Sequence, residues 1–150
     1  MTVTLDGETA TEKLGARIAR GLRPGDAVLL SGDLGAGKTV LARGVLRALG
    51  VAENVPSPTF TLVQTYETPA LALSHFDLYR IEEPEELAEL GLDDALSGGA
   101  ALIEWPEHGL PRRFSEDALH VTLTATGPET REARIEGPER WRGVLAGEPT

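Results

Sequence analysis

Hydrophobic residues follow two kinds of spacing along this chain, and each kind predicts a different element. Short apolar runs at residues 27–31 and 100–103 contain no charged side chain, which is typical of strands buried on both faces of a parallel sheet. A spacing of four residues indicates amphipathic helices, the first opened by Thr9 and Glu12 as a capping box and the second over residues 40–49. Apolar residues line one face of each helix, namely Leu14, Ile18 and Leu22 in the first and Leu41, Val45 and Leu49 in the second.

The rest of the pattern predicts antiparallel additions to this parallel centre, together with further helices. In chain order, the expected elements are an edge strand at residues 3–5, a hairpin of residues 60–66 and 71–76, an acidic helical segment ending near Leu96, a hairpin of residues 119–123 and 133–135, and a short helix around Trp141. We therefore expect a mixed sheet, parallel at its centre with antiparallel additions, and helices on both of its faces.

Residues 32–39 read Gly-Asp-Leu-Gly-Ala-Gly-Lys-Thr, which fits the Walker A pattern of a phosphate-binding loop. Glycines let the backbone turn its N–H groups toward an anion, Lys38 supplies charge to the β- and γ-phosphates, and the Thr39 hydroxyl is placed to bind Mg²⁺. Since the chain has two lysines against twelve arginines, a lysine here is not compositional background. The motif lies between a predicted strand and a predicted helix, so we expect an α/β, P-loop NTPase-like three-layer domain that spans residues 1–150 as one unit.

The composition of the chain limits the partners, the metal ligands and the cellular location that we expect for this protein. With 24 acidic against 14 basic residues, the chain of 150 residues carries a formal charge of −10, which disfavours unassisted binding of a nucleic-acid backbone. The absence of cysteine removes disulfides, thiolate zinc sites and thiol nucleophiles, and the histidines at 75, 108 and 120 match no ligand spacing. No apolar run approaches the roughly 20 residues of a membrane span and no secretory signal is visible, so we expect a cytoplasmic protein without membrane contact.

Acidic residues concentrate between Glu82 and Asp94, where no lysine or arginine occurs. One interpretation is a solvated helix whose acidic first turn complements the helix dipole. The other is an acidic patch that docks on a basic partner surface. The sequence leaves both interpretations open.

Two carboxylates follow predicted strands, Asp77 after residues 71–76 and Glu104 after residues 100–103. In open α/β sheets, ligands lie beyond the carboxyl ends of the strands. A phosphate-bound Mg²⁺ needs few protein ligands, and hydrolysis also needs a group that orients or deprotonates water. These two acids can cover both needs, although the division of roles between them stays open. Arg80 either reaches a phosphate or Asp77, or remains on the surface.

The segment Ser57-Pro58-Thr59 lies between the Walker helix and the next strand, where P-loop switch proteins sense the γ-phosphate. A plain connector is the alternative.

The base of the expected nucleotide can be narrowed by exclusion. Guanine-specific GTPases carry an Asn-Lys-x-Asp signature, whereas the single asparagine of this chain, Asn54, is followed by Val55. Adenine is therefore the expected base.

Several blocks of residues occur in an order and spacing that resemble one family. They are the Walker segment at residues 32–39, Ser-Pro-Thr-Phe-Thr-Leu at 57–62, His-Phe-Asp-Leu-Tyr-Arg at 75–80, Pro-Glu-Glu-Leu at 84–87 and Ile-Glu-Trp-Pro at 103–106. With these blocks the chain resembles the bacterial TsaE (YjeE) family, the small ATPase of tRNA threonylcarbamoyladenosine synthesis. The resemblance covers roughly residues 9 to 136 and is weakest after Gly137, so nothing is carried over there.

This resemblance implies a P-loop ATPase whose ligands are ATP and Mg²⁺. Thr39 and Glu104 would hold Mg²⁺ and Asp77 would take the Walker B role, so the expected catalytic residues are Lys38, Asp77 and Glu104. The residues expected to wrap the phosphates are Leu34, Gly35, Ala36, Gly37, Lys38 and Thr39.

The resemblance implies further contacts around the nucleotide. Glu8, just before the first helix, and Thr130, in the turn before Arg131, would lie near it, and Trp105 would lie beside the site. The family pattern also makes Ser57-Pro58-Thr59 a switch-like loop.

Partners are implied in the same way. Family members act with the TsaD–TsaB pair, which transfers a threonylcarbamoyl group to the N6 of an adenosine beside the anticodon. The ATPase would drive or reset that complex. It would meet tRNA only through the complex. Because no arginine finger in cis is evident beyond Arg80, slow hydrolysis is expected for the chain alone. Two other functions remain open: a small-molecule P-loop kinase with Arg112 and Arg113 as its lid, and a nucleotide-gated adaptor that hardly hydrolyses ATP.

Overall fold

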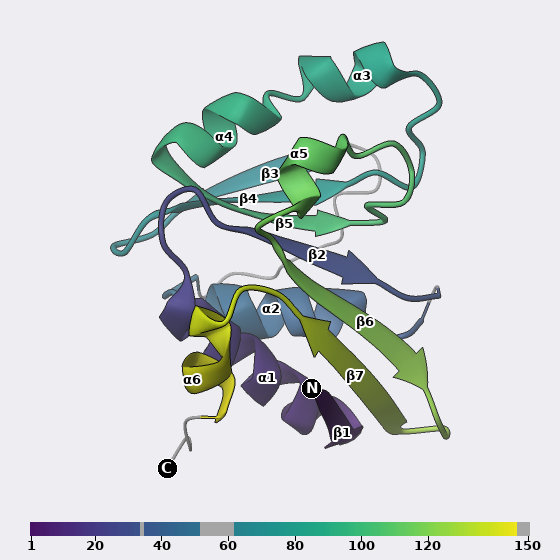
Figure 1. The fold of residues 1–150 in the computed structure, drawn as a ribbon. Helices are drawn as coiled ribbons and strands as arrows, with labels where there is room; N and C mark the ends of the chain where they lie inside the picture. The colour runs from purple at the N-terminus through teal and green to yellow at the C-terminus, as the bar shows by residue number, and fades with distance from the viewer. Residues whose placement is uncertain (34, 52–61, 147–150) are drawn as a thin grey trace.

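A seven-stranded mixed sheet runs through the molecule, and helices pack against it (Figure 1). The computed structural model describes residues 1–33, 35–51 and 62–146. The strands are β1 (Thr2–Asp6), β2 (Ala27–Ser31), β3 (Val63–Glu67), β4 (Ala72–Asp77), β5 (Gly99–Glu104), β6 (Leu119–Ala125) and β7 (Thr130–Glu136). The helices are α1 (Gly7–Gly21), α2 (Lys38–Ala48), α3 (Pro84–Glu89), α4 (Leu92–Gly98), α5 (Arg112–Ser115) and α6 (Arg140–Ala146).

Neighbouring strands follow the order β1-β7-β6-β2-β5-β4-β3. The central strands β6, β2, β5 and β4 run parallel to one another. Toward the two edges, β7 pairs antiparallel with β6, β1 with β7, and β3 with β4. The predicted mixed sheet, parallel at its centre with antiparallel additions, is confirmed. The parallel centre matters for the site because its strands end on the same edge.

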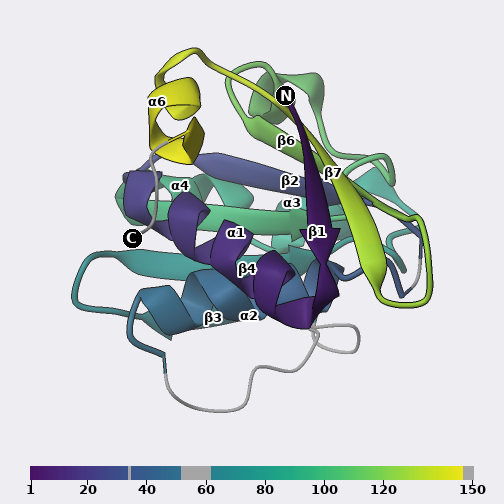
Figure 2. The same cartoon turned by 90° about the horizontal axis from the view of Figure 1, so that it is seen from below.

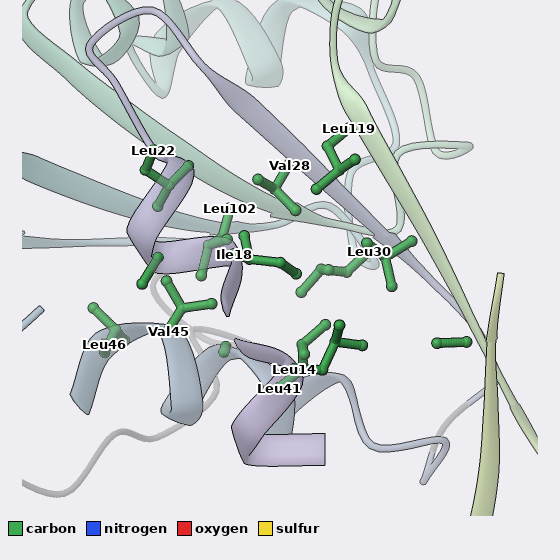
Figure 3. Close-up of a cluster of buried hydrophobic side chains, with 14 of the residues drawn as sticks. Leu14, Ile18, Leu22, Val28, Leu30, Leu41, Val45, Leu46, Leu102 and Leu119 are labelled. Atoms are coloured by element: carbon green, nitrogen blue, oxygen red, sulfur yellow. The ribbon is translucent and has the colours of Figure 1, made fainter. Parts of the chain in front are cut away.

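Helices cover both faces of the part of the sheet built from β2, β5 and β4, with α1 and α2 on one side and α3, α4 and α5 on the other (Figures 1 and 2). Alternate strand residues supply the two apolar faces. Val28, Leu30 and Leu102 pack against α1 and α2 (Figure 3), whereas Leu29 and Ile103 belong to the cluster on the opposite face. Because both faces are buried, β2 and β5 have no polar side, which explains their apolar runs, while β4 buries Ser74 and His75 among its apolar residues.

The strands β6, β7 and β1 are covered on one face only. Val121 and Ala133 are buried in the cluster that includes α1 and α2, whereas their neighbours Thr122 and Arg134 are exposed. This alternation is typical of antiparallel strands with one wet face. The predicted three layers are therefore complete over the centre of the sheet and reduced to two at this edge. Within the described residues, no helix has the length and apolar character needed to cross a bilayer.

The predicted start of the first helix is wrong. Helix α1 begins at Gly7 with Asp6 as its N-cap residue, and no side chain caps it. The chain passes directly from β1 into α1 through Gly7, whose φ is +85°, so the helix is already formed at Thr9. Instead of closing a capping box, the Glu12 carboxylate accepts a hydrogen bond from Arg47 of α2 at 3.0 Å. An ion pair between α1 and α2 has therefore taken the place of the predicted capping box.

The acidic segment forms two helices rather than the single one predicted. Gly91 has a φ of +77° and separates α3 from α4. At the start of α3, the Glu86 carboxylate accepts hydrogen bonds from the backbone N–H groups of Glu82 and Glu83, both at 2.9 Å. These two hydrogen bonds lower the pKa of Glu86. Several of the acidic residues thus serve helix ends, as the solvated-helix interpretation expects.

Helices α1 and α2 meet backbone to backbone, and this contact fixes the position of α2. A Cβ added to Gly15 would lie 2.5 Å from the carbonyl oxygen of Leu41. A Cβ added to Gly44 would overlap the carbonyl oxygen of Glu12. Since glycine at both positions lets the helices approach this closely, the N-terminus of α2 is held at a defined place above the strand ends.

Replacing Gly44 with Ala tests this contact. The added methyl group has only backbone to displace, so we expect the free energy of unfolding to fall by about 1–3 kcal/mol, measured by urea denaturation. Gly143→Ala in α6 is the matched control, because a Cβ added to Gly143 would meet nothing within 4 Å. That variant should keep its stability or gain up to about 1 kcal/mol from better helix propensity. Equal stability of both variants would contradict the backbone contact.

Candidate functional site

A pocket of about 770 Å³ opens where the parallel strands β2, β4 and β5 end. Its walls come from the start of α1, the loop between β2 and α2, the ends of β4 and β5, and the turn between β6 and β7. The predicted site residues that line it are Glu8, Gly35, Gly37, Lys38, Thr39, Asp77, Arg80, Glu104 and Trp105. The structure therefore brings residues from distant parts of the sequence into one cavity.

The loop between β2 and α2 needs glycine at two of its positions for different reasons. At Gly32, with φ +143°, an added Cβ would lie 2.5 Å from the carbonyl oxygen of Leu123, so β6 packs directly against the loop. At Gly37, φ is +105° and the residue caps α2, a left-handed conformation that side chains rarely adopt. Helix α2 then begins at Lys38, and the N–H groups of its first turn have no partner inside the helix. Such a helix start attracts anions.

The Lys38 side chain is held in place on two sides. Its side chain is almost fully buried, with a residue exposure of 5%, and its Nζ donates a hydrogen bond to the Gly32 carbonyl oxygen at 2.5 Å. The same Nζ lies 3.5 Å from the centroid of a Trp105 ring, which is a cation–π contact. The amine is thus held by two contacts and shielded from water.

Burial lowers the pKa of the Lys38 ammonium below its ordinary value of 10.5. The negative charges of Glu104, Asp77, Glu107 and Asp33 act in the opposite direction, in that order of strength, without cancelling the effect. A single lysine therefore lies among four carboxylates. This surplus of negative charge is suited to a bound cation.

Asp77 and Glu104 lie side by side at the ends of adjacent strands. The two residues are partners in the register of β4 and β5, and each is 3% exposed. The Asp77 Oδ1 accepts a hydrogen bond from the Tyr79 backbone N–H at 3.0 Å. The Glu104 Oε2 lies 2.6 Å from His75 Nε2, on the strand next to it. Both carboxylates are therefore held by neighbouring groups before any ligand binds.

Trp105 has an uncommon backbone conformation. Its φ is +59°, in the left-handed region that a bulky residue seldom adopts, and its N–H donates to the Leu30 carbonyl oxygen at 3.1 Å. The ring lies 4.9 Å from the Tyr79 ring and 5.3 Å from the His108 ring, centroid to centroid. Strain of this kind persists where the surroundings hold it, and here it directs the indole over Lys38.

Some predicted residues do not line the pocket. Ala36 is buried behind it, and its N–H donates to the Asp33 carbonyl oxygen at 3.0 Å. Thr130 is absent from the lining, although its neighbours Glu129 and Arg131 belong to it. The predicted contacts of Leu34 and of the switch-like segment Ser57, Pro58 and Thr59 lie outside the described residues.

The arginine lid expected for a kinase is not formed. Neither Arg112 nor Arg113 lines the pocket. The Arg113 guanidinium instead makes two hydrogen bonds to the exposed Asp93 carboxylate, at 2.9 and 3.0 Å. This pair joins α5 to α4 on the far side of the sheet from α2 (Figure 1). The arginines offered as the lid of a kinase therefore do not reach the pocket.

Several functional-site residues were not foreseen from the sequence. His75 precedes Asp77 by two residues in one strand, so period-two alternation alone could have placed both side chains on the same face. Tyr79 and His108 have no comparable signal. Arg131 reaches the loop between β2 and α2 only because the β6–β7 hairpin folds back toward it, and no local sequence pattern indicates this contact.

Comparison with known proteins identifies relatives of this chain. A family model described as "Threonylcarbamoyl adenosine biosynthesis protein TsaE" matches residues 5–133. A Rickettsia felis protein named "tRNA threonylcarbamoyladenosine biosynthesis protein TsaE" is 49% identical over 104 residues, covering 69% of this chain and 61% of the relative, so the match spans about three fifths of that protein. The protein of the same name from Streptomyces coelicolor is 40% identical over 149 residues, covering 90% of this chain and 99% of the relative. The crystal structure of YdiB from Bacillus subtilis has a TM-score of 0.79 and 26% identity, covering 97% of this chain and 91% of that chain.

Replacing Lys38 with Met tests the desolvated amine through the pH dependence of stability. Because the native pKa lies below 10.5, the unfolded chain binds more protons than the native one as the pH rises toward that value, so the native state is favoured. Relative to Lys38→Met, the wild type should gain unfolding free energy as the pH rises toward 10.5. Urea denaturation without nucleotide measures this difference.

Lys13, the other lysine of the chain, provides the control for this experiment. It is exposed on α1, so Lys13→Met should leave the pH dependence of unfolding as it is in the wild type. A difference between the wild type and Lys38→Met that stays flat or falls with pH would show that burial does not dominate at Lys38.

Proposed function

The chain belongs to the TsaE family, and from this premise we propose that it binds ATP with Mg²⁺ and hydrolyses it slowly in the service of tRNA threonylcarbamoyladenosine modification. The family acts in tRNA threonylcarbamoyladenosine biosynthesis, as the names of its members state. To this family role the proposal adds ATP as the ligand, Mg²⁺ as the cofactor and the TsaD–TsaB pair as the partner.

One observation carries the proposal: Lys38 and Thr39 at the start of α2 share a pocket with the paired carboxylates Asp77 and Glu104. A helix start and a lysine are suited to the phosphates of a nucleotide. A hydroxyl and a carboxylate nearby are the protein groups that a phosphate-bound Mg²⁺ requires. Few other chemistries need all four groups in one cavity.

Thr39 and Glu104 would hold the Mg²⁺, with Asp77 beside them in the Walker B role. The donor set fits this ion, because Thr39, Asp77 and Glu104 line one pocket and all offer oxygen ligands. In nucleotide sites Mg²⁺ takes one or two protein ligands and completes its shell with phosphate oxygens and water. When bound, it neutralises charge on the phosphates.

Lys38 and Trp105 prepare the pocket for the γ-phosphate. Lys38 donates to the Gly32 carbonyl oxygen in the ligand-free protein, and a phosphate oxygen is a stronger, charged acceptor for the same amine. Since Trp105 covers the amine, its charge acts in a medium of low dielectric constant, where attraction to phosphate is strong.

Asp77 and Glu104 supply the polar groups for hydrolysis. The hydrogen bond from the Tyr79 N–H holds the Asp77 carboxylate, and His75 holds that of Glu104. In the proposed reaction Glu104 serves the metal, and Asp77 orients the water that attacks the γ-phosphate.

Hydrolysis by the chain alone would be slow, because Arg131, one of the two arginines that line the pocket, is poorly suited to act as a finger. Four of the five N–H donors of Arg131 bind backbone carbonyls. Arg80 also lines the pocket and is the remaining candidate for a finger within the described residues of the chain. The positive charge of an arginine finger would come from the TsaD–TsaB complex, through which the acidic chain would also meet tRNA.

Nucleotide binding is tested by calorimetry with Mg·ATP and Mg·ADP. Lys38→Ala should weaken Mg·ATP binding at least about tenfold, because a charged hydrogen bond to phosphate is lost. Glu104→Gln should bind metal-free nucleotide at least as tightly as the wild type, because it removes one of the four carboxylates around Lys38, and it should lose the gain in affinity that Mg²⁺ brings. Lys13→Ala is the control for Lys38→Ala and should bind normally. No heat of binding with the wild type would overturn the proposed function.

Hydrolysis is tested by following phosphate release with and without TsaD–TsaB. We expect the rate to rise at least about tenfold in the complex, since a finger supplied in trans can be worth about 10³–10⁵ in rate. Asp77→Asn should abolish the stimulated rate, while Lys13→Ala should retain it. Equal rates with and without the partners would contradict the partner's role, and binding without any hydrolysis would favour the nucleotide-gated adaptor.

A further inference from the structure

Arg131 connects two walls of the pocket. Its Nε donates a hydrogen bond to the Ala36 carbonyl oxygen at 3.2 Å, and its Nη2 donates to that of Gly35 at 3.2 Å. Its Nη1 donates to the carbonyl oxygens of Gly127 at 3.2 Å and Thr130 at 2.9 Å. One guanidinium thus ties the phosphate loop to the β6–β7 turn, across 95 and 96 residues of sequence.

The β6–β7 turn is a firm anchor for this contact. The Thr126 N–H donates to the Thr130 carbonyl oxygen at 3.0 Å, and the Thr126 hydroxyl donates to that of Thr130 at the same distance. The Glu129 carbonyl oxygen accepts the Gly7 N–H at 2.8 Å, which joins the turn to the start of α1. The turn is therefore held from both sides before it reaches the phosphate loop.

The phosphate loop has a reason to need such an anchor. A nest of backbone N–H groups that converge on one point is unfavourable until an anion fills it. In a trans peptide the C=O and N–H point in opposite directions, so fixing the carbonyl of Ala36 also fixes the N–H of Gly37. Gly37 lines the pocket, and glycine on its own would leave this peptide unit free to turn.

We propose that Arg131 is the positioning residue of the phosphate loop: its guanidinium holds the Gly35 and Ala36 carbonyls turned toward the β6–β7 turn, so that the loop has its phosphate-binding shape before nucleotide arrives. The inference rests on the proposed nucleotide binding. Loop preorganisation lowers the ordering cost of binding, and the arginine charge behind the loop favours an anion in front of it.

The planar fork of arginine is essential to this role. Lys at position 131 would keep the positive charge but present one ammonium group, which cannot reach two loop carbonyls and two turn carbonyls together. Arg131→Lys therefore separates geometry from charge. Arg134 is the matched control, because it lies on the same strand with an exposed side chain.

The test measures Mg·ADP affinity by calorimetry for the wild type and for Arg131→Ala, Arg131→Lys and Arg134→Ala. We expect affinity to fall at least about tenfold in Arg131→Ala, a change of about 1.4 kcal/mol. Arg131→Lys should lose most of the same affinity, and Arg134→Ala should match the wild type. Wild-type affinity in either Arg131 variant would overturn the proposal.

A second measurement follows the stability of the loop structure in the absence of nucleotide. Amide hydrogen exchange of the ligand-free protein should be at least about tenfold faster at Ala36, whose N–H donates to the Asp33 carbonyl oxygen, in both Arg131 variants. Exchange in β4 and β5 should stay unchanged, which separates loss of the clamp from general unfolding. Unchanged exchange at Ala36, or equal acceleration throughout the sheet, would overturn the proposal. If the wild type binds no Mg·ADP, the proposed function fails, and the exchange rates still decide whether Arg131 holds the loop.

Discussion

Burial of charge at the ends of the parallel strands is the constraint on which this structure depends. Asp77 and Glu104 are each 3% exposed and Lys38 is 5% exposed, so three ionisable groups share one poorly hydrated space. A buried ion without a partner costs several kcal/mol, so these groups must be held in one arrangement. The register of β4 with β5 provides it, because it sets Asp77 beside Glu104 at the ends of the two strands.

Local strain at the site is balanced by packing elsewhere. Trp105 has a φ of +59° and Gly37 one of +105°, and neither conformation is favourable for an ordinary residue. Both residues adjoin elements that are firmly placed: Trp105 follows the fully buried strand β5, and Gly37 precedes α2, whose contact with α1 leaves no room for a side chain at Gly44. The core shared by α1, α2 and the sheet thus holds α2 and the adjoining Gly37 in place (Figure 3), whereas Trp105 packs against the cluster on the other face of the sheet.

Sequence patterns predicted the parts of the molecule that local interactions determine. Buried strands, the Walker segment and the strand-end acids Asp77 and Glu104 each follow from spacing and residue type within a few positions. The start of α1 was wrong because Gly7 and the Arg47–Glu12 pair outweigh a local capping box. The contact of Arg131 with Ala36 could not be predicted, because the two residues are 95 positions apart and meet only where the β6–β7 hairpin packs beside the loop that precedes α2.

Charge distribution explains how an acidic chain can serve a triphosphate. With a formal charge of −10, the protein cannot attract the nucleotide by its overall field. On the proposed function, attraction is instead confined to backbone N–H groups and Lys38, while Arg131 directs its hydrogen bonds to carbonyls rather than to phosphate. The four carboxylates around Lys38 would repel a metal-free nucleotide and accept one that carries Mg²⁺. On the proposed function, the acidic site would therefore select the metal complex over the free nucleotide, and the loop held by Arg131 would supply the N–H groups that bind its phosphates.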